Sequence, residues 1–192
     1  YASSSGTTNL VVNKTPTTTS VSTSPNPSNV GQNVQITATV SPSPDGGTVQ
    51  FKVNGANIGA PVNVVAGQAQ TTYAFPAVGV QVVTAEYSGT ANYDGSTGTA
   101  DHTVQKTPTT TTVVAAPNPA QVGQQVTFTA TVTPTPDGGT VQFKVDGGNV
   151  GGPVNVVAGK ATLQQTYATP GPRSIEAVYS GTAGYDGSTG NT

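Results

Sequence analysis

The sequence predicts an all-β protein of two tandem antiparallel β-sandwiches, with almost no helix. The first observation is a repeat of 92 residues: residues 14–100 align without a gap onto residues 106–192, and more than half of the aligned positions are identical. The second is the abundance of valine and threonine, which favour strands, in short runs that alternate apolar and polar residues. A fixed period of this size indicates an array of stacked domains. We therefore expect one domain at residues 14–105 and a second at residues 106–192.

Each strand of the repeat is expected where apolar side chains alternate with polar ones, because this pattern buries one face of a strand. In the clearest run, Val34, Ile36, Ala38 and Val40 are separated by polar residues. No segment repeats apolar residues at the 3.6-residue period of a helix. The expected strands of the first repeat cover residues 17–21, 34–40, 49–53, 62–65, 69–75, 83–87 and 99–105.

Turn-forming residues separate these strands. Residues 25–27 read Pro-Asn-Pro and must lie at a strand end or edge, since proline has no amide donor. Residues 54–55 read Asn-Gly, a hairpin turn, and the second repeat has Asp-Gly at 146–147. About seven short antiparallel strands per repeat is the pattern of an immunoglobulin-like sandwich. Residues 106–108 join the repeats without a flexible linker, so we expect an elongated pair.

Four segments of the first repeat resemble the bacterial Ig-like repeat domain (group 3 type), which is found in tandem in secreted and cell-surface proteins. They occur in the same order in both repeats, and the resemblance covers essentially the whole chain. It implies a module of a secreted or surface-anchored prokaryotic protein, in which such repeats act as stalks or spacers and sometimes belong to adhesins. The family offers no catalytic residues to transfer. The four segments are Pro25-Asn26-Pro27, Val30-Gly31-Gln32, Gly47-Thr48-Val49-Gln50-Phe51 and residues 85–93.

The composition excludes several classes of function. Charged residues make up 7% of the chain, against about 25% in an ordinary soluble domain, and the net charge is -2. Such a chain has no basic stripe for nucleic acid. It has no run of about 18 apolar residues, so we expect no membrane span. It has no cysteine, which excludes disulfides and thiolate metal sites.

The ionisable residues do not form a recognisable catalytic or metal-binding set. His102 is the only histidine, and its equivalent one repeat earlier is Leu10, so we interpret the position as structural. Each acidic turn has a single aspartate, whereas calcium takes about six to eight oxygen ligands. We therefore expect no metal, no cofactor and no enzymatic activity. The aspartates considered for calcium are Asp45, Asp94, Asp137 and Asp186.

Two further groups of residues have a functional and a structural interpretation. Lys52 and Glu86 are candidates for a Lys–carboxylate cross-link, but both fall on the outward face of their strands, which favours a solvated ion pair. The second repeat offers Lys144 and Glu176 on the same face. Four tyrosines are candidates for a sugar-stacking surface, but we interpret them as packing residues with a wet hydroxyl. These are Tyr87, Tyr93, Tyr179 and Tyr185.

The ends of the chain are out of phase with the repeat. Residues 1–6 match residues 93–98, while residues 101–105 have no equivalent after residue 192, so we expect the second domain to lack its last strand. Residues 1–13 then form an extra strand, a spare copy of the missing one. We predict that this strand is donated to the second domain of another copy, which builds an open head-to-tail filament. The candidate donor residues are Asn9, Leu10, Val11, Val12 and Asn13, of which Leu10 and Val12 share one face.

Three alternatives stay open. The chain is a fragment of a longer repeat array, or residues 1–13 fold onto their own first domain, or the protein is an adhesin or carbohydrate-binding module. For a ligand we look to residues 70–84, which share only Gly79 with the second repeat. Asn13 begins the glycosylation sequon Asn13-Lys14-Thr15.

We predict a non-enzymatic structural subunit of an extracellular fibre or surface stalk, a pilus-like filament with a role in adhesion or biofilm. Its first expected partner is a copy of itself. A host or matrix glycan or protein is the other partner that we expect. The predicted location is extracellular or at the cell surface.

Overall fold

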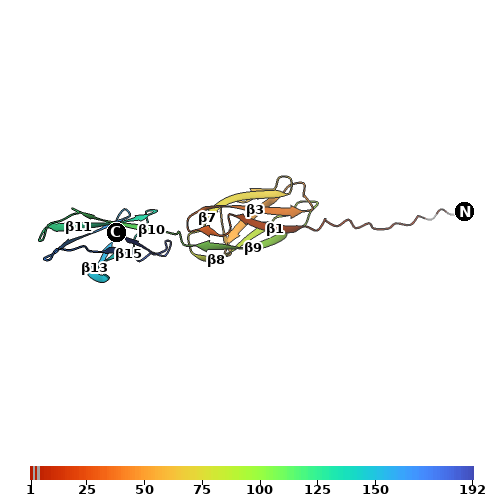
Figure 1. Cartoon of the computed structure of the whole chain (residues 1–192). Helices are drawn as coiled ribbons and strands as arrows, with labels where there is room; N and C mark the ends of the chain where they lie inside the picture. Colours follow the sequence, from red (N-terminus) through yellow and green to blue (C-terminus); the bar gives the residue numbers. More distant parts are fainter. Residues whose placement is uncertain (2, 4) are drawn as a thin grey trace. The chain divides into compact units, whose positions relative to one another are not determined.

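The computed structural model describes residues 1, 3 and 5–192, and all regular elements in this part of the chain are strands (Figure 1). The chain divides into two compact units, one built almost wholly from residues before Gln105 and the other mainly from Gln105–Thr192. Both the all-β fold and its division into two tandem sandwiches are therefore confirmed. Within the described residues no helix is long and apolar enough to cross a membrane.

The first unit consists of two antiparallel sheets (Figure 1). The smaller sheet has the order β1 (Thr18–Ser24), β3 (Asn33–Ser41), β7 (Gln68–Ala74). The larger sheet has the order β2 (Ser28–Asn29), β9 (Ser96–Gln105), β8 (Gly79–Tyr87), β4 (Thr48–Val53), β5 (Ala56–Asn57), and β6 (Val62–Asn63) also pairs with β4.

The second unit repeats this arrangement. One sheet has the order β10 (Thr110–Ala116), β11 (Gln125–Thr133), β14 (Lys160–Thr166). The other has the order β13 (Gly148–Asn155), β12 (Thr140–Val145), β15 (Ile175–Tyr179), β16 (Ser188–Asn191).

Alternation along the strands places the core between the two sheets, as the sequence predicts. In β3, Val34, Ile36 and Ala38 are fully buried and Val40 is 2% exposed. The polar residues between these four side chains lie on the other face of the strand. Burial of such aliphatic and aromatic side chains is the main term that holds a sandwich together, at about 1.5–3 kcal/mol for each large side chain.

Local backbone geometry confirms the predicted hairpin. Asn54 and Gly55 have φ values of 48° and 83°, and Asp146 and Gly147 have 51° and 81°. These positive values are what the two central residues of a tight type I′ turn require, and Asn, Asp and Gly adopt them at least cost.

The last strand begins earlier than expected. β9 starts at Ser96 rather than at Thr99, so the first part of the same strand, β16, is present in the second unit, where we expected the strand to be missing. β15 is also shorter than β8, because residues 79–82 of β8 form their ladder with residues 101–104 of β9. In the second unit the equivalent residues 171–174 lie outside β15.

Candidate strand-binding groove of the second unit

In the first unit, the end of β9 fills the space between β2 and β8. His102 is fully buried there and Val104 is 2% exposed, while their neighbours Asp101 and Thr103 are exposed. The strand therefore contributes two inward side chains and closes one end of the core.

Both ring nitrogens of His102 have a hydroxyl partner. Nε2 lies 2.9 Å from Ser28 Oγ, and Nδ1 lies 3.0 Å from Thr23 Oγ1. The ring stacks on Phe75 with 4.2 Å between the ring centroids and 15° between the planes. Because a hydroxyl can donate or accept, this site satisfies the neutral imidazole, and burial lowers the pKa of His102. The structural interpretation of His102 agrees with this position in the core.

The Asn26 side chain holds the backbone of β9 from the other side. Its Nδ2 donates to the Asp101 carbonyl at 3.1 Å, and the Thr103 amide donates to its Oδ1 at 3.0 Å. One amide side chain thus replaces a strand partner over two residues of β9.

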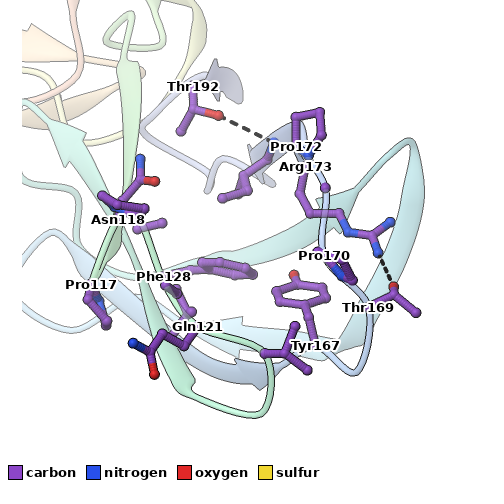
Figure 2. Close-up of a pocket in the computed structure, with 17 residues that line it drawn as sticks. Pro117, Asn118, Gln121, Phe128, Tyr167, Thr169, Pro170, Pro172, Arg173 and Thr192 are labelled. Carbon is purple, nitrogen blue, oxygen red and sulfur yellow. Dashed lines mark hydrogen bonds between the residues drawn. The ribbon is translucent and has the colours of Figure 1, made fainter.

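In the second unit the corresponding space is an open pocket of ≈ 570 Å³ (Figure 2). Its lining has an apolar floor and a few polar groups at the rim. Its lining includes Ala115, Asn118, Ala120, Tyr167 and Arg173. They stand at the repeat positions of Thr23, Asn26, Ser28, Phe75 and Gln81, each of which contacts or pairs with the end of β9 in the first unit. We call this pocket the groove.

Three polar groups of the groove differ in the hydrogen bonds that they make. The Tyr167 hydroxyl is buried and has no hydrogen-bond partner among the described residues, and burial raises the pKa of its phenol. Arg173 lies over the Tyr167 ring, 5.4 Å from the centroid, and donates hydrogen bonds to Asp146 at 3.0 Å and to Thr169 at 2.8 Å. The side-chain amide of Asn118, unlike that of Asn26, makes no hydrogen bond within the described part of the chain. The groove therefore contains a buried hydroxyl that the first unit does not have, and a rim amide that lacks the partners of its equivalent Asn26.

In the first unit, the backbone of β8 presents alternate residues to β4 and to β9. The Val82 carbonyl accepts from the Asn54 amide at 2.8 Å, and the Val82 amide donates to Asn54 Oδ1 at 2.9 Å, so Val82 faces β4. Because backbone groups alternate in direction along a strand, Gln81 faces β9, where it lies opposite His102.

The second unit has the same edge without the strand. The Ser174 carbonyl accepts from the Asp146 amide at 2.9 Å, and the Ser174 amide donates to Asp146 Oδ1 at 3.0 Å. Residues 172–174 lie outside β15, so we infer the direction of the neighbouring groups from β8: Arg173, at the position of Gln81, is expected to turn its backbone N–H and C=O towards the groove. Pro172, which has no N–H, shares the direction of Ser174 and faces away from the groove. This edge is therefore able to pair with an added strand.

The predicted donor residues are exposed and lie outside every strand. Leu10 is 86%, Val11 76% and Val12 83% exposed, and Asn9 and Asn13 are also exposed. The structure does not bring them into a sheet of the first unit. Contacts with the first unit begin at Lys14, whose Nζ donates to the Thr90 carbonyl at 2.7 Å.

The other residues considered from the sequence have structural roles. Tyr87 and Tyr179 are 4% and 2% exposed, and their hydroxyls donate to the Gly46 and Gly138 carbonyls at 2.9 Å, so they do not form a sugar platform. Surface ion pairs join Lys52 to Glu86 at 2.6 Å and Lys144 to Glu176 at 3.6 Å.

Asp45, one of the aspartates considered for calcium, has hydrogen-bond donors of its own. Its carboxylate accepts from Asn92 Nδ2 at 2.7 Å and Thr90 Oγ1 at 2.8 Å, which lowers the pKa of Asp45. In the described part of the chain no three acidic, histidine or cysteine residues gather where they could hold a metal.

Sequence reasoning indicated one part of the groove and missed the rest. Residues 70–84, singled out because they diverge between the repeats, correspond to residues 162–176, and this stretch includes Tyr167, Arg173 and Ile175 of the groove lining. Ala115 and Ala120 looked like ordinary substitutions. Their signal is visible only once Thr23 and Ser28 are known to contact His102.

These observations define the chain as a tandem of immunoglobulin-like sandwiches. Residues 18–105 and 111–192 each match the family described as bacterial Ig-like domain (group 3), so the chain belongs to this family. The comparison with curated proteins finds no match.

Several solved structures are similar to this chain. One is a protein from Corynebacterium diphtheriae described as membrane anchored (17% identity, TM-score 0.40, covering 90% of this chain and 58% of that chain). Another contains the titin domains Z1Z2 in complex with telethonin (17%, 0.44, 89% and 94%). A third is the adhesin InvE of Yersinia pseudotuberculosis (14%, 0.43, 91% and 58%). At these identities the likeness concerns the fold alone.

Proposed function

We propose that the protein is a non-enzymatic structural subunit of an extracellular fibre or surface stalk, which assembles when residues 9–13 of one copy enter the groove of the next. The observation that carries the proposal is a pair of complementary features. The groove is open where β9 ends in the first unit, and a repeat copy of that strand end is exposed elsewhere in the chain.

The register of β8 and β9 defines how the donated strand would pair. Asp101 lies opposite Val82, His102 opposite Gln81, and Val104 opposite Gly79. The β8 residues are then replaced by their equivalents one repeat later, and the β9 residues by their equivalents one repeat earlier. The pairs become Asn9 with Ser174, Leu10 with Arg173, and Val12 with Gly171. Thr192 already occupies the position of Ala100, so the donated strand enters the sheet at Asn9.

The side chains of the donor suit this register. Leu10 and Val12 take the inward positions of His102 and Val104, and Val11 takes the outward position of Thr103. Two apolar side chains that are more than four-fifths exposed in the free subunit become buried, which favours association.

Backbone groups of the groove are available for the same strand. The Arg173 edge supplies an N–H and a C=O, and Asn118 can hold residues 9 and 11 as Asn26 holds Asp101 and Thr103. Main-chain pairing supplies affinity in strand addition, and the alternate side-chain pockets supply specificity.

The contact is heterologous, because the N-terminal segment of one subunit meets the second unit of another. Heterologous contacts give an open filament when the rotation between subunits does not close a ring, and the filament is the form that we propose. The extracellular setting is supported by the family and by a surface rich in threonine, serine, glycine and asparagine with few charges.

Sedimentation velocity of the whole chain over a range of concentrations tests the proposal. We expect oligomers that grow with concentration, and we expect Leu10→Lys to remove them because an ammonium group beside the Arg173 guanidinium cannot be buried in the groove. Val11→Lys is the matched control, since residue 11 faces outward, and it should leave assembly in place. A wild-type chain that stays monomeric, or a Leu10→Lys chain that assembles like the control, contradicts the proposal.

A further inference from the structure

We infer that the groove selects its strand by the residue at the His102 position: the second unit accepts leucine and rejects histidine, and the first unit does the reverse. The inference rests on the proposed function and names the partner strand of the same site. The selection lies in three pairs of equivalent residues, which are Thr23 and Ala115, Ser28 and Ala120, and Phe75 and Tyr167.

The first unit is polar where the buried ring nitrogens are. Ser28 is 1% exposed, and its hydroxyl lies 2.9 Å from His102 Nε2. A leucine at this position removes that partner and leaves the Ser28 hydroxyl buried next to an apolar side chain. An orphaned buried polar group is unfavourable, so the first unit prefers its own histidine to the leucine of residues 9–13.

The second unit is apolar at the same two points. The side chains of Ala115 and Ala120 offer no atom that can bond an imidazole nitrogen, so a histidine donated to the groove would bury both nitrogens without the two hydroxyl partners. A leucine has no polar atom to satisfy and fits the methyl groups of the two alanines. The second unit therefore lacks the hydroxyls of Thr23 and Ser28, and its proposed strand has Leu10 where the first unit has His102.

Tyr167 does not restore the missing partner. If a donated histidine stacked on Tyr167 as His102 stacks on Phe75, the two rings would lie face to face. The tyrosine hydroxyl lies in the plane of its own ring and points past the edge of a stacked neighbour. The Arg173 guanidinium, 5.4 Å from the centroid of the Tyr167 ring, opposes a protonated imidazole, since both carry positive charge.

Reciprocal selection gives assembly a direction. Residues 9–13 cannot readily displace residues 101–105 from the first unit of any copy, and a strand like residues 101–105 cannot occupy the groove. The only favourable pairing of the spare strand is with a second unit, which excludes strand exchange at the first unit as a competing route.

Peptide binding to the whole chain tests the selection separately from the proposed function. The chain carries Leu10→Lys so that its own N-terminal segment does not compete. The probes are a fluorescently labelled peptide with the sequence of residues 7–14 and the same peptide with Leu10→His, measured by fluorescence polarisation. We expect the leucine peptide to bind and the histidine peptide to bind at least about ten-fold more weakly, from the cost of unsatisfied buried nitrogens.

A groove with Ala115→Thr, Ala120→Ser and Tyr167→Phe should reverse this preference, because it carries the first unit's residues at all three positions. Thermal unfolding of this triple variant, compared with the parent chain, checks that the second unit still folds. If the triple variant does not fold, the single variant Ala120→Ser is used in its place. Equal binding of the two peptides to both chains overturns the selection and leaves the proposed function standing. Failure of the leucine peptide to bind the parent chain at all overturns the proposed function and the selection with it.

Discussion

The contact between Ser28 and His102 makes a sharp prediction about the end of β9. Ser28→Ala removes the hydroxyl that lies 2.9 Å from Nε2, while the ring stays fully buried. The Nε2 atom then has no partner and no access to water. From the usual cost of an unsatisfied buried polar group, we expect a loss of about 1–3 kcal/mol in the free energy that keeps β9 closed.

Hydrogen exchange of the intact chain, followed by mass spectrometry, measures this loss where it occurs. Amide protons of residues 101–105 exchange through opening of the strand, so the loss of about 1–3 kcal/mol should speed their exchange by about 5- to 150-fold. Peptides from β12 and β15 of the second unit provide an internal reference within the same sample, and they should not change.

Ser20→Ala is the matched control. Ser20 is exposed and its hydroxyl makes only a long contact of 3.4 Å with the Thr39 carbonyl. Its removal should change exchange in β9 little. If Ser28→Ala exchanges at the rate of Ser20→Ala, the account of how the first unit holds His102 is wrong, and the basis of strand selection falls with it.

Three further outcomes follow from the structure. Burial lowers the pKa of His102 below its ordinary 6.5, so the unfolded chain takes up the proton first as pH falls. The first unit should therefore lose stability below about pH 6.5, as measured by urea unfolding. The second unit has no histidine and should not follow this titration. Gly98→Ala should severely destabilise the first unit in a thermal melt, because a Cβ there would collide with the Thr19 carbonyl, whereas Gly152→Ala, whose Cβ meets nothing, should be nearly neutral. Lys52→Ala should cost less than about 1 kcal/mol in the same melt, since its partner Glu86 is solvent-accessible, and a larger loss would show that the pair is more than a surface contact.

Local pattern was sufficient to predict most of the fold. The alternation in residues 34–40 and 49–53 identifies β3 and β4, and Asn54-Gly55 identifies the hairpin that follows β4. The two-residue strands β2 and β5 were not predicted, because so short a stretch has no period and is defined only by its partner. Residues 79–82 were missed for a related reason: Val80 and Val82 are 62% and 43% exposed and belong to β8 through pairing with β9.

The groove required information that a linear pattern does not contain. From the repeat alone we predicted that residues 9–13 are a copy of the end of the last strand and a candidate donor strand. The sequence did not indicate which residues receive the strand. Ser28 and Thr23 are more than seventy residues from His102 along the chain, and only the fold shows that they meet it. Ala115 and Ala120 can be interpreted as the loss of these two hydroxyls only when the contacts with His102 are known.

A designed disulfide tests the central claim, donation of residues 9–13 to the groove, most directly. The chain has no cysteine, so Asn9→Cys with Ser174→Cys introduces a single pair. The equivalent residues Asp101 and Val82 lie opposite each other, and Val82 directs its backbone groups to Asn54, which makes this a non-hydrogen-bonded pair with Cα atoms about 4.5 Å apart, within disulfide range.

If residues 9–13 are donated to the groove, mild oxidation gives a ladder of covalent dimers, trimers and longer oligomers on a non-reducing gel. Reduction should return all of these bands to monomer. Leu10→Cys with Ser174→Cys, which places one thiol on the opposite face of the strand, should give no ladder. Monomer alone from the Asn9 and Ser174 pair, or the same ladder from both pairs, would contradict donation of residues 9–13 to the groove.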